Sequence, residues 1–394
     1  MNKTPKLRFK EFSGELESTV LDGLAEITMG QSPIGESYNS EGEGIGLING
    51  PVEFTNKYPV VSQYTTKPTK YCNDGDILFC VRGSSIGRMN ISDDTYCIGR
   101  GVASIRAKKN KSTTNYIYAL LQNKLETIIG FANGSTFPNI SSVELKKSII
   151  KVPKLEEQEK IASFFSLIDD KISLQGEKVE ALKDYKNGMM QKIFSRELRF
   201  KGFSKEWKTT TLGKVTNSFE YGMNAAATEF DGENKYIRIT DIDENTSKYI
   251  NKNIVSPLGE LEDKYLVKEN DILFARTGAS TGKTYIYDNK DGNLYFAGFL
   301  IKANVNRDNS SKFIFFQTKT KEYDKWIKIM SMRSGQPGIN AKEYASYSFL
   351  APSKEEQEKI GDFLMKIDKK IDNEMSKLES LNEYKKGLLQ QMFV

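Results

Sequence analysis

The 394-residue sequence contains no histidine. Histidine is the usual general base near neutral pH, it activates the nucleophile in Ser–His and Cys–His enzymes, and it is the commonest metal ligand. Its absence excludes those two kinds of nucleophilic catalysis. Catalysis by carboxylates or lysine stays compatible with the composition, but we do not expect this chain to be an enzyme on its own.

Cysteine and long apolar runs are also scarce. The three cysteines, Cys72, Cys80 and Cys97, lie in the first third of the chain without Cys-x-x-Cys spacing, which argues against a disulfide framework or a metal site. No stretch approaches the ~18 consecutive apolar residues of a membrane span, and residues 1–10 lack the apolar core of a signal peptide. We therefore expect a cytoplasmic protein.

The length and the charge set broad limits on architecture and partners. A chain of 394 residues is too long for one compact core, so two or more domains are expected. The formal net charge of +5 is a mild excess that is compatible with binding a polyanion such as nucleic acid.

An internal repeat determines the predicted organisation. Three motifs occur twice in the same order, about 195 residues apart, which indicates two copies of one unit. The copies are Leu7–Ser13 and Leu198–Ser204, Asp76–Phe79 and Asp271–Phe274, and Glu156–Ile161 and Glu355–Ile360. Each copy consists of a globular domain and a helix, and the predicted segments are 1–155, 156–195, 196–353 and 354–394.

The globular part of each copy mixes short apolar runs with glycine, asparagine, serine and threonine, which is typical of an α+β domain rich in loops. Buried strands are predicted at 76–81 and 271–275. Helices are predicted at 115–129 and 312–329.

The end of each copy carries a sustained heptad pattern, which predicts two long helices in coiled-coil contact. The predicted seam residues are Ile161, Phe165, Ile168, Ile172, Gln175, Val179, Leu182, Lys186, Met189 and Ile193, and Ile360, Leu364, Ile367, Ile371, Glu374, Leu378, Leu381, Lys385, Leu388 and Met392. Ser353 and Glu356 are compatible with a capping box on the second helix.

We expect the two helices to pair with each other, antiparallel, because only that direction closes a duplicated unit on itself with pseudo-two-fold symmetry. Each helix of roughly 35 residues at ~1.5 Å rise would span about 50 Å and hold the two domains at the ends of a rod. The alternative is that each helix pairs with another molecule.

The apolar stripe is wider than a two-helix seam requires. Phe164, Tyr185, Phe363 and Tyr384 occupy one flanking heptad position, and Met190 and Leu389 occupy the other. This surplus indicates either that helices of partner proteins complete a larger bundle or that these side chains pack on their own globular domain. The candidate residues for coiled-coil contact and subunit docking are Ile161, Phe164, Phe165, Ile168, Ile172, Val179, Leu182 and Tyr185, and Ile360, Phe363, Leu364, Ile367, Ile371, Leu378, Leu381 and Tyr384.

One segment superficially resembles a phosphate-binding loop. Gly278–Thr284 has three residues between its glycines where the P-loop has four, and the first copy, Gly83–Met89, lacks the Lys-Ser/Thr pair. The shared Gly-x-Ser-x-Gly string also occurs at hydrolase nucleophiles, but no histidine is available to activate the serine. An NTPase therefore remains only a secondary hypothesis.

The features that both copies share fit an anion-binding loop better. A Gly/Ser turn lets backbone N–H groups approach a phosphate, and the Arg88 or Lys283 that follows adds positive charge. A second Gly/Pro-shaped element, 133–140 or 333–339, offers amides and hydroxyls for hydrogen bonds to DNA. The candidate DNA-binding residues are Arg82, Ser84, Ser85, Arg88, Asn133, Ser135, Thr136, Arg276, Ser280, Thr281, Lys283, Arg333 and Gln336. The alternative is a tight turn with solvated charges.

Motifs for catalysis are not found. The Asn/Asp-Pro-Pro-Tyr/Phe string of amino methyltransferases is missing, and no carboxylate–lysine cluster suggests a metal nuclease. We therefore expect no catalytic residue, no metal ligand and no cofactor in this chain.

The ordered set of motifs, occurring twice, resembles the specificity subunit family of type I restriction–modification systems over nearly the whole chain. The set consists of Asp-Ile-Leu-Phe, Gly-x-Ser-x-Gly-Arg/Lys, a Gly-Ser or Ser-Gly loop, and Pro followed by Glu-Glu-Gln-Glu-Lys-Ile at the start of a long helix. The resemblance implies two target-recognition domains, each reading one half of a bipartite double-stranded DNA target in the major groove.

The resemblance also implies that the paired helices measure the unread spacer and dock two methylation subunits. Those partners would use S-adenosylmethionine, and a separate restriction subunit, a translocase–nuclease, would use ATP and magnesium. The alternative interpretation is a coiled-coil scaffold, or a protein with duplicated domains that bind something other than DNA.

Overall fold

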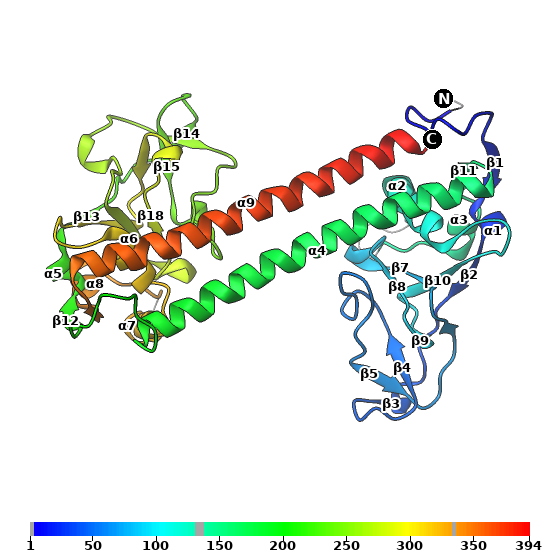
Figure 1. Cartoon of the computed structure of the whole chain (residues 1–394), viewed down its shortest axis with the longest axis horizontal. Coiled ribbons are helices and arrows are strands. Elements are labelled where there is room, and N and C mark those ends of the chain that lie inside the picture. Colours follow the sequence, from blue (N-terminus) through cyan, green and yellow to red (C-terminus); the bar gives the residue numbers. More distant parts are fainter. Residues whose placement is uncertain (1–3, 131–137, 333–335) are drawn as a thin grey trace. The chain divides into compact units, whose positions relative to one another are not determined.

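The computed structural model describes residues 4–130, 138–332 and 336–394, and the chain forms two compact units (Figure 1). The first unit comprises Met1–Lys178 and Glu374–Val394, and the second comprises Val179–Asn373. Each unit contains one globular domain and stretches of both long helices, α4 (Leu155–Phe194) and α9 (Lys354–Met392). The predicted α+β class with duplicated domains is confirmed.

The domain of the first unit is built on an antiparallel four-stranded sheet of order β2-β10-β7-β8. A five-stranded sheet of order β3-β5-β4-β9-β6 and a two-stranded sheet, β1-β11, complete it. Its strands are β1 (Glu17–Val20), β2 (Ala25–Met29), β3 (Tyr38–Asn39), β4 (Ile45–Ile48), β5 (Gln63–Thr65), β6 (Tyr71–Cys72), β7 (Ile77–Cys80), β8 (Met89–Ile91), β9 (Tyr96–Ile98), β10 (Val102–Ala107) and β11 (Ile149–Val152).

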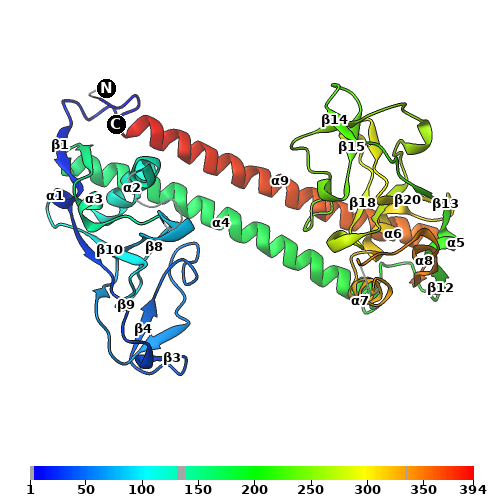
Figure 2. The ribbon, with the colours of Figure 1, turned by 180° about the vertical axis from the view of Figure 1, so that it is seen from behind.

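The helices of this domain are α1 (Leu21–Leu24), α2 (Thr114–Gly130) and α3 (Ser142–Lys146). Helix α2 lies beside the start of α4 (Figure 2). Its residues Tyr116, Ile117, Leu120 and Leu121 lie on one face of the helix and form a single core with the sheet and with the start of α4. The predictions of a strand at 76–81 and a helix at 115–129 are therefore confirmed within one or two residues.

The domain of the second unit repeats the same frame, with a four-stranded antiparallel sheet of order β13-β20-β17-β18 and a two-stranded sheet, β12-β21. Two small sheets, β14-β16 and the parallel pair β15-β19, stand where the first domain has its five-stranded sheet. The strands are β12 (Lys208–Thr211), β13 (Thr216–Tyr221), β14 (Ala227–Glu229), β15 (Lys235–Ile237), β16 (Val255–Pro257), β17 (Asp271–Ala275), β18 (Thr284–Ile286), β19 (Leu294–Phe296), β20 (Leu300–Val305) and β21 (Ser348–Ala351).

The helices of the second domain correct one prediction. In place of a single helix at 312–329 the chain forms α6 (Ser311–Gln317) and α7 (Lys321–Met330), and it also forms α5 (Leu212–Val215) and α8 (Ala341–Ser346). The break follows from the hydroxyls of Thr318 and Thr320, which donate to the carbonyls of Phe315 and Gln317. Thr320 then accepts from the Tyr323 N–H as the N-cap of α7.

The long helices pair antiparallel in each unit, as predicted. In the first unit the Gln175 amide donates to the Glu374 carboxylate at 2.7 Å, and the Lys385 ammonium lies 2.5 Å from the Asp169 carboxylate. In the second unit Lys186 and Asp368 form an ion pair at 2.6 Å. The partner number falls along α9 as the residue number rises along α4, so the helices run in opposite directions.

The predicted seam combines buried apolar residues with polar ones. Ile161, Phe165, Ile360 and Leu364 are buried, whereas Ile168, Ile172, Leu182, Leu378 and Leu381 are only half-buried. Hydrogen bonds from Gln175, Lys178 and Lys377 lower the pKa of Glu374 to about 2, so this seam residue stays charged. Polar seam residues of this kind specify register at some cost in stability.

The start of each long helix is held by an arginine from the repeated Leu-Arg-Phe-Lys motif. Arg8 donates two hydrogen bonds to Glu157, both at 2.7 Å, and Arg199 donates two to Glu356, at 3.0 and 2.6 Å. The predicted Ser353–Glu356 capping box is therefore wrong, because Arg199 holds the Glu356 carboxylate. We call each Arg–Glu pair a clasp.

A neighbouring glutamine explains more of the Glu-Glu-Gln-Glu-Lys motif. The Gln158 amide donates to the Pro153 carbonyl at 2.9 Å and its oxygen accepts from Ser112, while Gln357 bonds in the same way to Pro352 and to the backbone N–H of Ser310. The motif thus ties the helix start to the loop that precedes α2 or α6.

The aromatic residues at the flanking heptad position have two different environments. Phe164 packs edge-on against Phe9 at 5.7 Å between ring centroids, and Phe363 packs against Phe200 at 5.4 Å. Tyr185 and Tyr384 are instead 51% and 58% exposed. Packing on the chain's own unit therefore accounts for the phenylalanines but not for the tyrosines.

Candidate functional site

The Gly-x-Ser-x-Gly motif forms the turn between a central strand of the four-stranded sheet, β7 or β17, and the antiparallel edge strand that follows it, β8 or β18. A short 3-10 helix opens the turn, at Gly83–Ser85 or Gly278–Ser280. Both glycines of each motif have positive φ, +73° and +84° in the first unit and +70° and +93° in the second. The conformation favours glycine, so the motif is explained by backbone geometry.

The second predicted element lies beside this turn in both units. In the first unit Gly83 N–H donates to the Pro138 carbonyl and Ile140 N–H donates to the Val81 carbonyl, both at 2.9 Å. In the second unit Gly278 N–H donates to Pro337 and Ile339 N–H donates to Arg276, again at 2.9 Å. The structure therefore brings together two loops separated by about 60 residues, which we call the paired loops.

The side chains on the paired loops of the first unit are largely exposed. Arg82, Ser84 and Arg88 are exposed and Ser85 is half-buried. The Arg82 Nε donates to the Asn139 side-chain oxygen at 3.1 Å, which fixes the guanidinium against the second loop. The candidates Asn133, Ser135 and Thr136 lie outside the described residues.

The paired loops of the second unit hold a different arginine. The Arg276 guanidinium lies over the ring of Tyr221, 4.9 Å from its centroid. Ser280 and Thr281 are half-buried, and the Thr281 hydroxyl donates to the Gly278 carbonyl at 2.8 Å, while Gln336 is exposed. The candidate Arg333 lies outside the described residues.

The cations that follow the two turns are also in different environments. Arg88 is exposed, whereas Lys283 is half-buried and its ammonium lies 3.4 Å from the Glu244 carboxylate. Glu244 is 76% exposed, so this contact is a weak surface pair.

The two arginines are not equivalent positions. The backbone carbonyls of Val81 and Arg276 both accept from the second loop, so Arg276 corresponds to Val81, and Arg82 corresponds to Thr277. Both positions lie in extended chain, where successive side chains point to opposite faces. The arginine therefore projects from one face of the extended chain in the first unit and from the opposite face in the second.

The segment that resembled a P-loop lacks the structure that a P-loop requires. Thr284, which follows Gly-Lys, begins strand β18 and not a helix. A helix N-terminus supplies the N–H groups that hold the phosphates in a P-loop. The structural basis for an NTPase is therefore missing from this segment.

Lys319 is a notable residue that the sequence analysis missed. Its ammonium donates to the hydroxyls of Ser247 at 2.6 Å and Thr284 at 2.5 Å and lies 4.6 Å from the centroid of the Phe315 ring. Although the side chain as a whole is only half-buried, burial of the amine together with the charge of Lys186 lowers the pKa of Lys319 to about 7. Lys319 links the α6–α7 break to the strand that leaves the turn.

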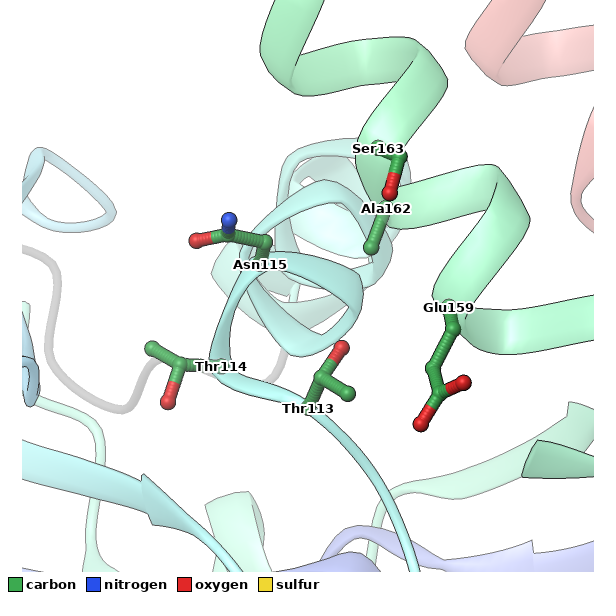
Figure 3. Close-up of a pocket in the computed structure, with 6 residues that line it drawn as sticks. All are labelled: Thr113, Thr114, Asn115, Glu159, Ala162 and Ser163. Atoms are coloured by element: carbon green, nitrogen blue, oxygen red, sulfur yellow. The ribbon is translucent and has the colours of Figure 1, made fainter. Parts of the chain in front are cut away.

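A pocket of about 270 Å³ lies in the first unit between α2 and α4 (Figure 3). It is lined by Thr113, Thr114, Asn115, Glu159, Ala162 and Ser163. None of the candidate DNA-binding residues lines this pocket. At the matching positions of the second unit an ion pair between Lys312 of α6 and Asp362 of α9, at 2.7 Å, joins those two helices.

Metal-binding and thiol chemistry find no support in the described part of the chain. No group of three or more histidine, cysteine, aspartate or glutamate side chains able to hold a metal ion occurs in residues 4–130, 138–332 and 336–394. Cys72, Cys80 and Cys97 are unpaired and buried, and burial raises the pKa of Cys80 to about 12. None of the helices in these ranges is long and apolar enough to cross a membrane.

Comparison with known proteins gives one consistent result. The family described as "Type I restriction modification DNA specificity domain" matches residues 14–184 and again 204–383. The putative type I restriction enzyme MjaX specificity subunit of Methanocaldococcus jannaschii is 37% identical over 176 residues, which are 45% of this chain and 41% of that protein. The MjaVIII specificity subunit of the same organism is 22% identical over 87% of this chain and 81% of its own length.

Solved structures show the same fold. The crystal structure of the type I restriction–modification S subunit from M. genitalium matches with a TM-score of 0.68 at 20% identity and covers 99% of both chains. A chain from a study titled for complex assembly and conformational transition of the type I R-M system matches with a TM-score of 0.56 at 15% identity, over 96% of this chain and 99% of that one. Because the family matches both copies and most of the sequence, this chain belongs to the type I restriction–modification DNA specificity family.

Proposed function

We propose that the chain is the DNA sequence-specificity subunit of a type I restriction–modification enzyme, in which each domain reads one half of a bipartite double-stranded target. The observation that carries this proposal is the pair of loops held by the same backbone hydrogen bonds in both units but bearing different side chains. A constant frame with variable side chains is what two different half-sites require.

The contacts on the paired loops suit DNA. An arginine guanidinium can donate to O6 and N7 of guanine, and Arg82 and Arg276 are each held by one neighbour, Asn139 or Tyr221. Arg88 and Lys283 follow the turns, where a cation can meet a phosphate. We propose that the held arginines read bases and that the two cations contact the backbone.

The long helices would set the distance between the half-sites and dock two methylation subunits and a restriction subunit. The exposed Tyr185 and Tyr384 on the flank of the helix pair support docking, because a large aromatic side chain gains most from burial. We further propose that this chain catalyses nothing and acts in the cytoplasm. S-adenosylmethionine, ATP and magnesium would be bound by the partner subunits.

The test is a map of methylated adenines across the source genome, by long-read sequencing, with and without the gene for this chain. We expect one bipartite methylated motif to disappear on deletion and to return on complementation. An unchanged methylome in a strain whose methylation subunit is expressed and active would overturn the proposal. Binding to purified DNA without a steep loss of affinity at rising salt would instead favour a scaffold or a non-DNA ligand.

A further inference from the structure

Each unit exposes a row of side chains along one side of its helix pair. In the first unit this side comprises Leu167, Lys171, Leu174, Lys178, Lys377, Ser380 and Tyr384, which we call flank 1. In the second unit it comprises Ala181, Tyr185, Lys366, Lys370 and Asn373, which we call flank 2. By the repeat, Leu167 corresponds to Lys366 and Leu174 corresponds to Asn373.

The residues of flank 1 lie on one side of the helix pair. The carboxylate of Glu374 is 3.0 Å from the Lys178 ammonium and 3.1 Å from the Lys377 ammonium, so lysines of both helices border the same seam residue. The Asp169–Lys385 and Gln175–Glu374 contacts fix the register between these helices. In that register Tyr384 lies level with Lys171, between the two leucines.

Flank 1 exposes apolar side chains that the contact between the two helices leaves uncovered. Leu167 is 70% exposed, Leu174 is 65% exposed and Tyr384 is 58% exposed. Leucines one heptad apart form a ridge that fits the groove of another helix. The matching positions of flank 2 are the exposed and polar Lys366 and Asn373, which leaves Tyr185 as its large apolar residue.

Charge indicates the kind of helix that fits. Flank 1 carries Lys171, Lys178 and Lys377, flank 2 carries Lys366 and Lys370, and neither flank contains a carboxylate. Acidic side chains of the two helices lie in the seam, as Glu374 does, or on other faces, as Asp170 does. A partner helix with an apolar ridge bordered by glutamate or aspartate therefore complements both flanks.

We infer that the two methylation subunits of the proposed function bind this chain unequally, the first on flank 1 through Leu167 and Leu174 and the second more weakly on flank 2. Two identical partners present the same acidic and apolar helix to two unlike surfaces. On flank 1 that helix buries two leucines and a tyrosine. On flank 2 it meets mainly lysines, whose attraction is screened by salt.

The inference rests on the proposed function and is tested with the full-length chain and the purified methylation subunit of the same system. Stepwise binding is followed by isothermal titration and native mass spectrometry at about 0.1 and 0.5 M salt. We expect the first binding constant to exceed the second by about tenfold or more at the lower salt, and the ratio to grow at the higher salt. Hydrogen exchange of the one-to-one complex should protect residues 164–178 before residues 363–373.

Exchanging the side chains between the flanks provides the matched variants. Leu167→Lys with Leu174→Asn should weaken the first step by about tenfold or more, since both side chains leave an apolar contact. Lys366→Leu with Asn373→Leu should strengthen the second step by a similar factor. Glu177→Lys, at another exposed position of α4, serves as the control and should change neither step by more than about twofold.

Other outcomes would overturn the inference alone or the inference together with the proposed function. Two equal binding constants, or protection of 363–373 first, would overturn the inference and leave the specificity role intact. Dimerisation of the chain alone that is lost in the Leu167→Lys, Leu174→Asn variant would assign flank 1 to a second copy and also overturn it. Failure of the folded chain to bind the methylation subunit at all would overturn both the inference and the proposed function.

Discussion

The two domains differ most in the sheets that they add to a shared four-stranded frame. The first domain adds a five-stranded sheet to its four-stranded frame, and the second adds two small two-stranded sheets in the same part of the sequence. The frame itself, with its buried central strands, clasp and paired loops, is the same in both. The comparison shows that the frame positions the loops and that the inserted sheets and side chains can vary without disturbing it.

Removing the arginine of each clasp is the strongest test of whether the frame is equivalent in the two units. Arg8→Ala should destabilise the first unit, and Arg199→Ala the second, by about 3–5 kcal/mol each, because Glu157 and Glu356 would be left charged and buried. Their side chains are 4% and 2% exposed. The measurement is urea unfolding followed by hydrogen exchange in each unit.

Lys160→Ala, which removes an exposed partner of Glu11 near the first clasp, is the control and should cost less than about 1 kcal/mol. A large effect in one unit and a negligible one in the other would show that the clasp is not a shared element of the frame.

The paired loops allow the two units to be separated by function. Under the proposed function, Arg276→Ala should weaken binding to DNA by about 1–3 kcal/mol and relax specificity in one half-site only, and Arg82→Ala should do the same in the other half-site. Competition between targets with one half scrambled gives the measurement. Arg88→Ala is the comparison variant, which should weaken all sequences alike and reduce the salt dependence.

Loss of specificity in the same half-site from both arginine variants would contradict the assignment of one half-site to each unit. Tyr221→Phe keeps the ring beneath Arg276 and should retain specificity, which would show that the aromatic ring and not the Tyr221 hydroxyl holds the guanidinium.

Helix packing provides a smaller contrast between the units. A Cβ on Gly361 would lie 2.7 Å from the Lys312 Cβ and 3.0 Å from the Phe313 nitrogen. Gly361→Ala should therefore destabilise the second unit by about 1–2 kcal/mol, although alanine is the better helix former by about 1 kcal/mol. The matching Ala162 is buried beside the pocket of the first unit.

Thermal unfolding of Gly361→Ala and Ala162→Gly checks this contrast, since both should destabilise for opposite reasons. Stabilisation by Gly361→Ala would mean that α6 can move away from α9 at little cost.

Because of Lys319, the stability of the second unit should depend on pH differently from that of the first. Its pKa is about 7 in the folded chain and near 10.5 when unfolded, so the unfolded state binds more protons between these values. The second unit should therefore become more stable as pH rises from 7 towards 10, by a few degrees in Tm. The penalty of the buried charge is present in full below pH 7.

Lys319→Met should flatten this part of the pH profile for the second unit and leave the first unit unchanged, as measured by hydrogen exchange at pH 7 and pH 9. An unaltered slope in the variant would assign the pH dependence to other groups.

Features with a local pattern were predictable from the sequence, and features made by contacts distant in the chain were not. The heptads predicted both long helices, the internal repeat predicted their antiparallel pairing, and the Asp-Ile-Leu-Phe motif predicted the central strands. The break at Thr318–Thr320 was missed because hydroxyl capping overrides an apolar pattern that continues into α7. No local sequence pattern predicts the hydrogen bonds between the paired loops, because they join residues far apart in the chain.

Some of the missed contacts did leave a trace in the sequence. Arg8 and Glu157 are both repeated, as Arg199 and Glu356, so a search for co-repeated opposite charges would have found the clasp. The position of Arg276 over Tyr221 left no such trace, since Tyr221 belongs to no repeated motif.

The clasp also bears on how such a chain can change its target. Each domain lies between two fixed sequences, Leu-Arg-Phe-Lys at its start and Glu-Glu-Gln-Glu-Lys at its end, whose side chains bind each other and the loop before α2 or α6. A recombination event within those two sequences would therefore exchange a whole domain and keep the contacts of the clasp. Specificity can then change by shuffling gene segments, with no new helix interface to evolve.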